Sequence, residues 1–374
     1  MHQPVISGTG VFTPSEIITN DELVATFNAY ADNFNAEHAA EIAAGEIAEM
    51  AHSSSEFIVA ASGIHQRHVL DKTGILDPEV MHPLLRQRSD DEPGVMAEMA
   101  VDACNKALAK AGKRAADVDA VIVAASNLER AYPAIAIEVQ DLLGINGFGF
   151  DMNVACSSAT FGIQAASDMI RSGSARAILV VNPEICSGHL EWRDRDCHFI
   201  FGDVCTATLI ERKEDVTALH FEVISTKCLT QFSNNIRNNN GFLRRSRPDG
   251  VSDRRDMQFM QNGRKVFKEV LPIVSKHILS HLEAEGASPD QLKRLWLHQA
   301  NKAMNDFIGR KVLGRVPEPG EQPNILQDYA NTSSAGSIIA FAQYSDDIEN
   351  GELGLICSFG AGYSVGSVLL KRVC

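Results

Sequence analysis

Three segments in the first half of the chain resemble three segments in the second half, in the same order. The matched pairs are 118–127 (VDAVIVAASN) with 292–301 (LKRLWLHQAN), 153–162 (NVACSSATFG) with 328–337 (DYANTSSAGS), and 201–213 with 359–373. Each match is short, but an ordered set of matches indicates two copies of one structural unit. We therefore expect two halves of one topology, 1–213 and 214–374, related by a pseudo-twofold axis.

Apolar runs of strand length recur along the chain and are bounded by polar residues. They lie at 118–126, 176–182, 204–210, 292–298, 353–358 and 365–370. Such runs are typical of strands that are buried on both faces of a sheet. Between them, residues 94–112 carry apolar residues at helical spacing and end in Gly-Lys, which predicts a helix. The alternation of strands and helices predicts the α/β class.

Charge and hydropathy exclude several classes of protein. The 374 residues include 34 Lys and Arg against 48 Asp and Glu, and this net charge of −14 disfavours nucleic acid or an anionic membrane as a partner. No apolar run approaches the roughly 18 residues that would cross a bilayer. The start, MHQPVISGTG, lacks the pattern of a cleavable signal. We expect a cytoplasmic protein without membrane insertion.

Eight cysteines are present, but no CxxC pair and no usual zinc-ligand spacing occurs. The sequence therefore predicts neither a metal site nor a disulfide framework. A cysteine within an apolar stretch is most often a small buried hydrophobe. A catalytic role for any one of them needs further evidence.

That evidence comes from the internal symmetry, which aligns Cys156 with Asn331 at the start of two small-residue stretches that could begin helices. His298 ends the strand of another matched pair, and open α/β sheets bind ligands at such strand ends. Taken alone, His298 would be a core histidine and Asn331 a helix cap. Together, a thiol whose pKa is lowered by a helix N-terminus could accept an acyl group, with backbone amides of its own turn and of Gly360–Gly362 holding the oxyanion.

The motifs around these residues resemble those of thiolase-fold condensing enzymes of the β-ketoacyl-acyl-carrier-protein synthase III type. Besides Cys156, the chain carries His-Gln-Ala-Asn at 298–301, Tyr-x-Asn-Thr-Ser at 329–333 and Phe-Gly-x-Gly at 359–362. The resemblance covers nearly the whole chain. It implies a layered α-β-α-β-α architecture, with the nucleophilic cysteine in the first half and the histidine and asparagine in the second.

The resemblance also implies a decarboxylating Claisen condensation. Cys156 would take an acyl primer from acyl-CoA, and malonyl on acyl carrier protein would then lose carbon dioxide and attack the acyl-enzyme. His298 Nε2 and Asn331 Nδ2 would donate to the malonyl thioester oxygen, while the amides of Cys156 and Ala361 would stabilise the intermediate at the primer carbonyl. No metal or redox cofactor is implied.

Departures from the family pattern concern the substrate. Phe57 and Ala61 stand where short-primer members carry Trp and Arg for the CoA adenine, and Ala303, beside Lys302, replaces another Arg. Extra segments lie at 30–52, expected to be a helix, at 71–93 and at 230–262. We expect these additions to reshape the entrance and acyl tunnel, and the primer to be medium-chain rather than acetyl.

Further candidate substrate contacts are basic or aromatic. Residues 237–255 contain six Arg against two Asp, with Arg264, Lys265 and Lys268 nearby. Arg244 and Arg245 would lie in a landing patch for CoA phosphates or the acidic carrier protein, although a solvated loop is the simpler interpretation. The segment 126–136 resembles the family stretch that walls the partner's acyl pocket, which makes Tyr132 a candidate gate and predicts a homodimer. Phe161 is a further candidate contact.

Other interpretations stay open at this point. Condensing enzymes of secondary metabolism, which make quinolones or polyketides or join acyl chains head to head, share this motif set. A papain-like peptidase or amidase has Cys, His and Asn in the same chain order, but Cys156 lacks the Cys-Gly-x-Cys-Trp context. A catalytically silent acyl-binding protein on the same fold is the third alternative.

Overall fold

The computed structural model describes residues 1–241 and 255–373. Its large sheet contains β1 (Pro4–Phe12), β4 (Ala120–Ala124), β5 (Phe148–Met152), β6 (Ala177–Glu184), β7 (Val204–Arg212), β8 (His220–Ser233), β11 (Leu292–Leu297), β12 (Leu353–Gly360) and β13 (Gly362–Val373). These nine strands follow one another in the order β11-β12-β13-β8-β1-β7-β6-β4-β5. Two small sheets pair β2 (Glu16–Thr19) with β3 (Gln66–Val69) and β9 (Ile236–Arg237) with β10 (Met260–Gln261).

The strand order repeats itself on either side of the β1–β8 pair. From β1 outward, β7 and β6 are antiparallel neighbours and β4 runs parallel to β6. From β8 outward, β13 and β12 are antiparallel neighbours and β11 runs parallel to β12. Only β5, at the edge, extends the first set beyond the second among the described residues. The predicted pair of halves with one topology is confirmed.

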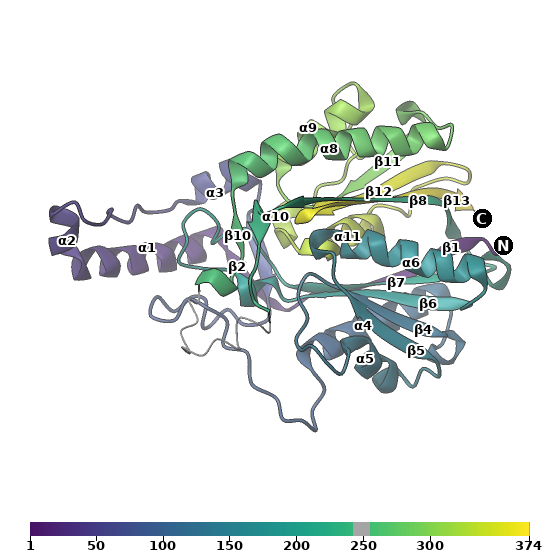
Figure 1. The fold of residues 1–374 in the computed structure, drawn as a ribbon, viewed down its shortest axis with the longest axis horizontal. Helices are drawn as coiled ribbons and strands as arrows, with labels where there is room; N and C mark the ends of the chain where they lie inside the picture. The colour runs from purple at the N-terminus through teal and green to yellow at the C-terminus, as the bar shows by residue number, and fades with distance from the viewer. Residues whose placement is uncertain (242–254, 374) are drawn as a thin grey trace.

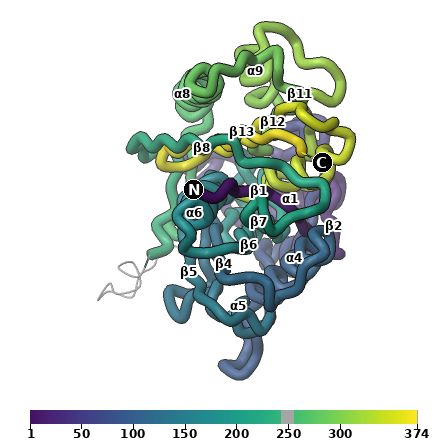
Figure 2. Tube along the Cα trace, turned by 90° about the vertical axis from the view of Figure 1, so that its right-hand side faces the viewer, coloured from purple at the N-terminus to yellow at the C-terminus, as the bar shows by residue number. Residues whose placement is uncertain are grey.

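Helices form three layers around the two halves of the sheet (Figures 1 and 2). The helices are α1 (Asn20–Glu37), α2 (Ala39–Ala43), α3 (Ser55–Ser62), α4 (Val95–Ala111), α5 (Ile135–Leu143), α6 (Ser158–Ser172), α8 (Gly263–Ala284), α9 (Lys302–Leu313), α10 (Leu326–Tyr329) and α11 (Gly336–Gln343). In Figure 1, α6 and α11 lie in the middle, α4 and α5 cover one outer face, and α8 and α9 cover the other. This is the expected α-β-α-β-α layering.

Burial on both faces explains why the strands read as continuous apolar runs. In β4, Ile122 packs into the middle core with α6 and α11, whereas Val121 and Val123 pack into the outer core with α4 and α5. A third core joins α8 and α9 to the second half of the sheet. Each predicted strand and the helix at 94–112 are present.

The extra segment at 30–52 differs from its prediction. The helix begins earlier, at Asn20, because the Thr19 side chain accepts from the Glu22 amide and the Glu22 carboxylate accepts from the Thr19 amide. It ends at Glu37, a short α2 follows, and Gly45 adopts a left-handed φ of 74°. The prediction that residues 30–52 form one added helix is therefore wrong. Figure 1 shows α1 and α2 projecting beyond the body of the molecule.

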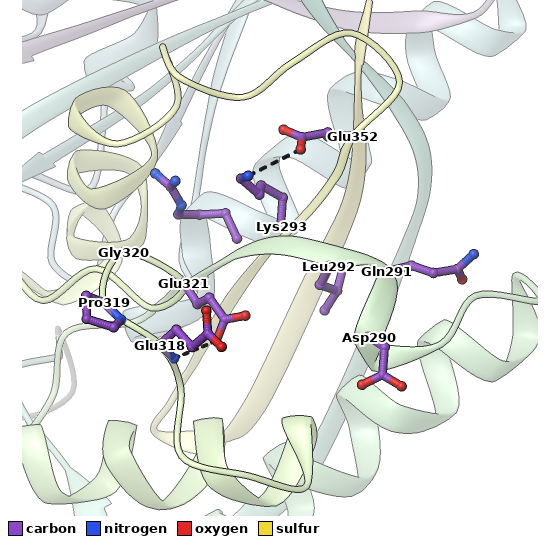
Figure 3. Close-up of a pocket in the computed structure, with 10 residues that line it drawn as sticks. Asp290, Gln291, Leu292, Lys293, Glu318, Pro319, Gly320, Glu321 and Glu352 are labelled. Atoms are coloured by element: carbon purple, nitrogen blue, oxygen red, sulfur yellow. Dashed lines mark hydrogen bonds and ion pairs between the residues drawn. The ribbon is translucent and has the colours of Figure 1, made fainter.

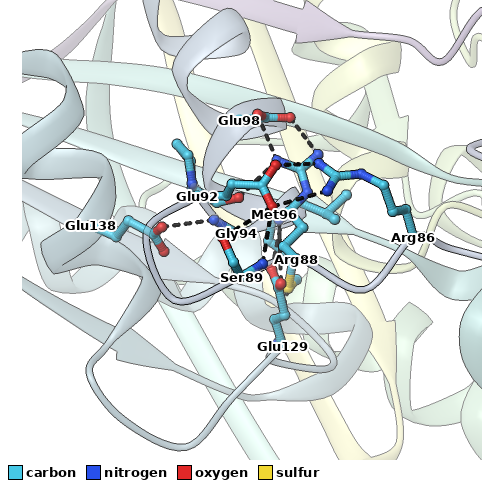
Figure 4. Close-up of polar contacts among 11 residues, drawn as sticks. Arg86, Arg88, Ser89, Glu92, Gly94, Met96, Glu98, Glu129 and Glu138 are labelled. Carbon is cyan, nitrogen blue, oxygen red and sulfur yellow. Dashed lines mark hydrogen bonds and ion pairs between the residues drawn. The ribbon is translucent and has the colours of Figure 1, made fainter.

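The extra segment at 71–93 is tied to the start of α4 by charged side chains (Figure 4). Arg86 pairs with Glu92 at 2.5 Å and Arg88 with Glu98 at 2.6 Å. At the same helix start, Glu129 accepts from the amides of 95 and 96, and Glu138 accepts from the amide of 94. Carboxylates suit these positions because the first amides of a helix have no partner within it. The contacts join the loop at 126–136 to α4.

Candidate active site

One cavity of about 340 Å³ is lined by Cys156, His298 and Asn331, the three residues that the sequence predicts to act together. They come from three separate segments, after β5, after β11 and after α10. Phe359 and Gly360, at the end of β12, complete the same wall. The structure therefore brings the predicted nucleophile and both predicted side-chain donors to one surface.

Cys156 lies in the short 3-10 turn η2 (Ala155–Ser157), which connects β5 to α6. Ala155 adopts a left-handed φ of 47°, an uncommon conformation for a residue with a side chain. Neighbouring polar groups stabilise it: Asn153 Oδ1 accepts from the Ala155 amide at 2.9 Å, and the Ser158 hydroxyl accepts from the Val154 amide at 2.8 Å. This local network fixes the thiol at the entrance to α6.

The turn η7 (Ser333–Ala335), which leads into α11, has nearly the same backbone. Its first residue, Ser333, has a φ of 50°, matching the φ of 47° at Ala155. By this geometry the counterpart of Cys156 is Ser334, so the alignment of Cys156 with Asn331 is wrong by three residues. Both segments are rich in small residues, and such similarity does not determine the register of a turn.

Asn331 is held by backbone and side-chain hydrogen bonds. Its amide donates to Ile200 O at 2.9 Å, and its carbonyl accepts from the Gly202 amide at 3.1 Å. Its side-chain Oδ1 accepts from the Ser333 amide at 2.9 Å. Since the oxygen is used in this way, the side-chain Nδ2 is the atom left to donate into the cavity.

His298 follows β11 and is 2% exposed. Its amide donates to Cys357 O at 2.7 Å, and its ring packs edge-to-face against Phe359 at 5.2 Å. Burial lowers the pKa of His298 to about 4, although a hydrogen bond with the Ser333 main chain opposes the shift. The imidazole is therefore neutral near pH 7, with one N–H to donate.

The Cys156 thiol differs from its prediction. Burial raises its pKa to about 11. The Ser333 hydroxyl, which donates to Sγ at 3.5 Å, and the amides of Ala361 and Cys156 lower it, whereas the charge of Glu184 raises it. The expected low pKa is wrong for the free enzyme, because desolvation outweighs the turn's amides and the neutral imidazole adds no positive charge. The two amides predicted for the oxyanion thus act on the thiol in the predicted direction, although burial outweighs them.

The walls of the cavity are largely apolar and come from segments without a sequence motif. They include Phe199, Phe201, Phe259, Val266, Phe267, Val270 and Met304. Sequence reasoning missed these residues, because nothing distinguishes them from core residues until the fold is known. Of the extra segments, 230–262 contributes Ile236, Phe259 and Gln261, whereas none of the lining residues comes from 30–52 or 71–93. Ala31, Ile75 and Met81 of those two segments pack instead in the same hydrophobic cluster as Phe199 and Phe201.

Phe57 and Ala61, predicted from their departure from the family pattern, both line the cavity. The Arg195 guanidinium lies 4.2 Å from the centre of the Phe57 ring, within cation–π range. Phe199 meets the same ring edge-on at 5.8 Å. Arg195 carried no signal in the sequence that separated it from other surface arginines.

The remaining predicted contacts lie outside the cavity lining. Tyr132 is 85% exposed, Arg264 and Lys268 are exposed on α8, and Lys302 pairs with Asp306 at 2.7 Å. Phe161, on α6, approaches Gly366 of β13. Arg244 and Arg245 are outside the described residues. None of the five described residues lines the cavity that contains Cys156.

A second cavity of about 350 Å³ lies at the outer edge of β11 (Figure 3). Its lining is mostly charged or polar, and several of its charges are paired: Lys293 pairs with Glu352 at 3.3 Å and Glu321 with Arg315 at 2.6 Å. Its lining contains no cysteine, serine, threonine or histidine. Within residues 1–241 and 255–373, no group of His, Cys, Asp or Glu is placed to hold a metal ion, and no helix is long and apolar enough to cross a membrane.

Buried histidines make stability dependent on pH. Burial lowers the pKa of five of them to about 4: His189, His198, His277, His281 and His298. An unfolded histidine binds its proton below about pH 6.5, so the unfolded state binds more protons between pH 6.5 and 4. The stability that neutral histidines contribute is present above pH 6.5 and is lost as the pH falls through this window.

We therefore expect the free energy of unfolding to fall by roughly 3 kcal/mol or more between pH 7.5 and pH 5. Glu184 and Asp203, whose pKa values burial raises to about 7 and about 6, oppose this trend, because the folded state keeps their protons longer. Urea unfolding at the two pH values measures the difference. Equal unfolding midpoints would contradict the prediction.

Comparison with known proteins agrees with this geometry. Residues 150–227 match the family model of 3-oxoacyl-[acyl-carrier-protein (ACP)] synthase III, and residues 282–372 match the model of its C-terminal part. The chain is 58% identical over 348 residues to a β-ketodecanoyl-[acyl-carrier-protein] synthase of Pseudomonas aeruginosa, covering 93% of this chain and 99% of that one. It is 29% identical to a β-ketoacyl-[acyl-carrier-protein] synthase III of Granulibacter bethesdensis, over 99% and 100% of the two chains.

Among solved structures, the 3-oxoacyl-[acyl-carrier-protein] synthase III of Aquifex aeolicus superposes with a TM-score of 0.77 at 23% identity, covering 98% of this chain and 99% of that one. This similarity supports the fold, and the sequence relatives support the family. The peptidase and silent-binder interpretations are wrong. The chain belongs to the β-ketoacyl-[acyl-carrier-protein] synthase III family and is a condensing acyltransferase of fatty acid synthesis.

Proposed function

We propose that this enzyme condenses a medium-chain acyl primer, delivered by CoA, with malonyl on acyl carrier protein. The observation that carries the proposal is the single apolar-walled cavity in which Cys156, His298 and Asn331 meet. A relative with 58% identity is named for the ten-carbon product β-ketodecanoyl, which supports a primer longer than acetyl. The named catalytic residues are part of the proposal.

In the first half-reaction, Cys156 Sγ attacks the thioester carbon of the primer. The carbonyl oxygen becomes an oxyanion, which the amides of Cys156 and Ala361 stabilise. The bond from carbon to the CoA sulfur then breaks, and CoA leaves as a thiol with the proton that Cys156 lost. Because burial holds the pKa of Cys156 near 11, the neutral His298 ring is the base that relays this proton.

In the second half-reaction, malonyl on the carrier protein loses its carboxylate as carbon dioxide, and the electron pair forms an enolate. His298 and Asn331 Nδ2 donate to the enolate oxygen. The enolate carbon attacks the acyl carbon on Cys156, the carbon–sulfur bond breaks, and the thiolate takes up a proton from solvent. The product is a β-ketoacyl group on the carrier protein that is two carbons longer than the primer.

The wider assignments rest on exposure and charge. We assign Arg264, Lys268 and Lys302, with Arg244 and Arg245, to the docking of CoA phosphates and of the acidic carrier protein. Tyr132 is exposed, and the nearby amides of Ile135 and Ala136 donate to Asp151 on the edge strand β5. This placement suits a homodimer in which Tyr132 reaches the partner's acyl pocket. Phe161 stays a candidate contact. We further propose a division into halves at 213/214 and a cytoplasmic location.

The test is intact-mass spectrometry after incubation with acyl-CoAs of two to sixteen carbons. We expect one acyl adduct, strongest at medium chain length and absent from Cys156→Ala, because among the cysteines of residues 1–241 and 255–373 Cys156 alone lines the cavity. Cys228→Ala is the matched control, since Cys228 is also partly exposed but lies on β8 away from the cavity. The absence of an adduct at every length, or an adduct that persists in Cys156→Ala, would overturn the assignment.

A further inference from the structure

Glu184, the last residue of β6, is a buried carboxylate that the mechanism above does not use. It is 1% exposed, and no ion pair to it occurs within residues 1–241 and 255–373. Burial raises its pKa to about 7, while hydrogen bonds from Ser126 and Ser334 lower it. A buried carboxylate without a counter-ion destabilises a fold unless its oxygens are well bonded, so its position calls for an explanation.

Both carboxylate oxygens accept hydrogen bonds from segments that carry the active site. Oε1 accepts from the Ser126 amide at 3.1 Å, and Oε2 accepts from the Ser126 hydroxyl at 2.5 Å. Oε1 also accepts from the Ser334 amide at 3.2 Å and from the Ser334 hydroxyl. Ser126 follows β4 in the first half of the fold, and Ser334 belongs to η7 in the second half. One side chain therefore joins the two halves of the fold by hydrogen bonds.

From Ser126, the contacts continue to the nucleophile. Its carbonyl accepts from Asn153 Nδ2 at 2.8 Å, and Asn153 Oδ1 accepts from the Ala155 amide at 2.9 Å. Ala155 is the left-handed residue that immediately precedes Cys156. The position of the thiol thus depends on the position of Ser126.

From Ser334, the contacts continue to the donors. The adjacent Ser333 donates its hydroxyl to Cys156 Sγ at 3.5 Å and its amide to Asn331 Oδ1 at 2.9 Å. The Ser333 main chain also raises the pKa of the His298 ring, so this turn affects His298 as well. Cys156 and Asn331 are therefore connected to Glu184 by hydrogen bonds through the two turns.

We propose that Glu184 is a positioning residue, which holds the turns bearing Cys156 and Asn331 in their mutual geometry for the condensation. It does not touch the substrate. The inference rests on the proposed roles of Cys156, His298 and Asn331. The Glu184 carboxylate also has a second effect: its negative charge raises the pKa of the Cys156 thiol. The other titratable groups that its charge affects are Cys186, in the turn η3 (Cys186–His189), and Cys205 on β7.

Positioning of the turns by Glu184 favours the reaction, whereas its charge makes the Cys156 thiol harder to deprotonate. The variant Glu184→Gln separates these two effects. The amide keeps the shape but loses the charge, and its NH₂ group cannot accept from the serine donors. We expect the turnover number for condensation to fall about 10- to 100-fold with little change in KM, because the turns lose register. At the same time, the pH midpoint for alkylation of Cys156 by iodoacetamide, followed by peptide mass spectrometry, should shift to lower pH.

Glu184→Asp tests geometry with the charge retained. The shorter side chain cannot reach Ser126 and Ser334 together, so turnover should fall while the alkylation midpoint stays near that of the wild type. Glu211→Gln is the matched control, because Glu211 is equally buried but pairs with Lys113 at 2.9 Å, at the far end of β7. This control should change neither quantity.

Two outcomes would overturn the proposal. One is a folded Glu184→Gln variant whose turnover number for condensation is within about twofold of that of the wild type. The other is a folded Glu184→Asp that turns over at the wild-type rate, because this variant keeps the charge and loses only the reach of the side chain. Cys156→Ala separates this failure from that of the proposed function: if Cys156→Ala still condenses, the catalytic assignment is wrong, whereas an inactive Cys156→Ala beside a normal Glu184→Gln rejects only the role of Glu184.

Discussion

Gly360→Ala should lower acylation of Cys156 by about 100- to 1000-fold, because the new methyl group would occupy the space of the nucleophile. A Cβ atom at this position would lie 2.6 Å from Cys156 Cβ and 3.0 Å from Sγ. Carbon and sulfur atoms cannot approach so closely, so the thiol turn, the end of β12 or both must move. The amide of Ala361, which follows directly, would move with it away from the oxyanion.

The measurement is the rate of adduct formation with a medium-chain acyl-CoA, followed by intact mass. Gly188→Ala is a suitable control, since a Cβ there would make only an ordinary contact, 3.9 Å from Ile185. Overpacking destabilises a core by about 1 to 3 kcal/mol, so circular dichroism must show that the variant is folded. A folded Gly360→Ala enzyme that is acylated at the normal rate would show that the thiol lies elsewhere during catalysis.

Asn331→Ala should slow decarboxylation of malonyl on the carrier protein by about 100- to 1000-fold, the usual effect of removing one preorganised donor. Acylation of Cys156 should change much less, because the amides that serve the primer carbonyl come from Cys156 and Ala361. Release of carbon dioxide from labelled malonyl substrate, measured beside acyl-enzyme formation, separates the two half-reactions.

The alanine variant also removes the hydrogen bond that Oδ1 accepts from the Ser333 amide, so a second variant is required. Asn331→Asp keeps an oxygen for that bond but has no N–H to offer the enolate. Both variants should therefore lose decarboxylation if the donor is what counts. Normal release of carbon dioxide in either would refute the role given to Asn331.

Strands and catalytic motifs were predictable from the sequence because their determinants are local. Double-faced burial makes β4 and β12 continuous apolar runs, and the turns around Cys156 and Asn331 need small residues at set positions. The cavity walls were not predictable, because Phe199, Phe259 and Val266 meet only through the tertiary fold. The projecting α1 was only partly predictable, since its capping box lay outside the segment expected to form the helix.

The pKa of the Cys156 thiol likewise could not be predicted from the local sequence. A cysteine at the start of a helix predicts a stabilised thiolate, and the amides of Ala361 and Cys156 do act in that direction. Burial acts the other way and is larger, and no local pattern reports how much protein will surround a residue. The buried charge of Glu184, far away in the sequence, was equally invisible.

The central position of α6 and α11 limits how far the enzyme can open locally around its catalytic turns. Both helices begin at the catalytic turns and are enclosed by the two halves of the sheet, so any opening that exposes them amounts to global unfolding (Figure 1). Amide protons beside the nucleophile should thus be among the slowest to exchange with solvent. The short α2 has no buried residue, so substitutions there should leave this central layer undisturbed.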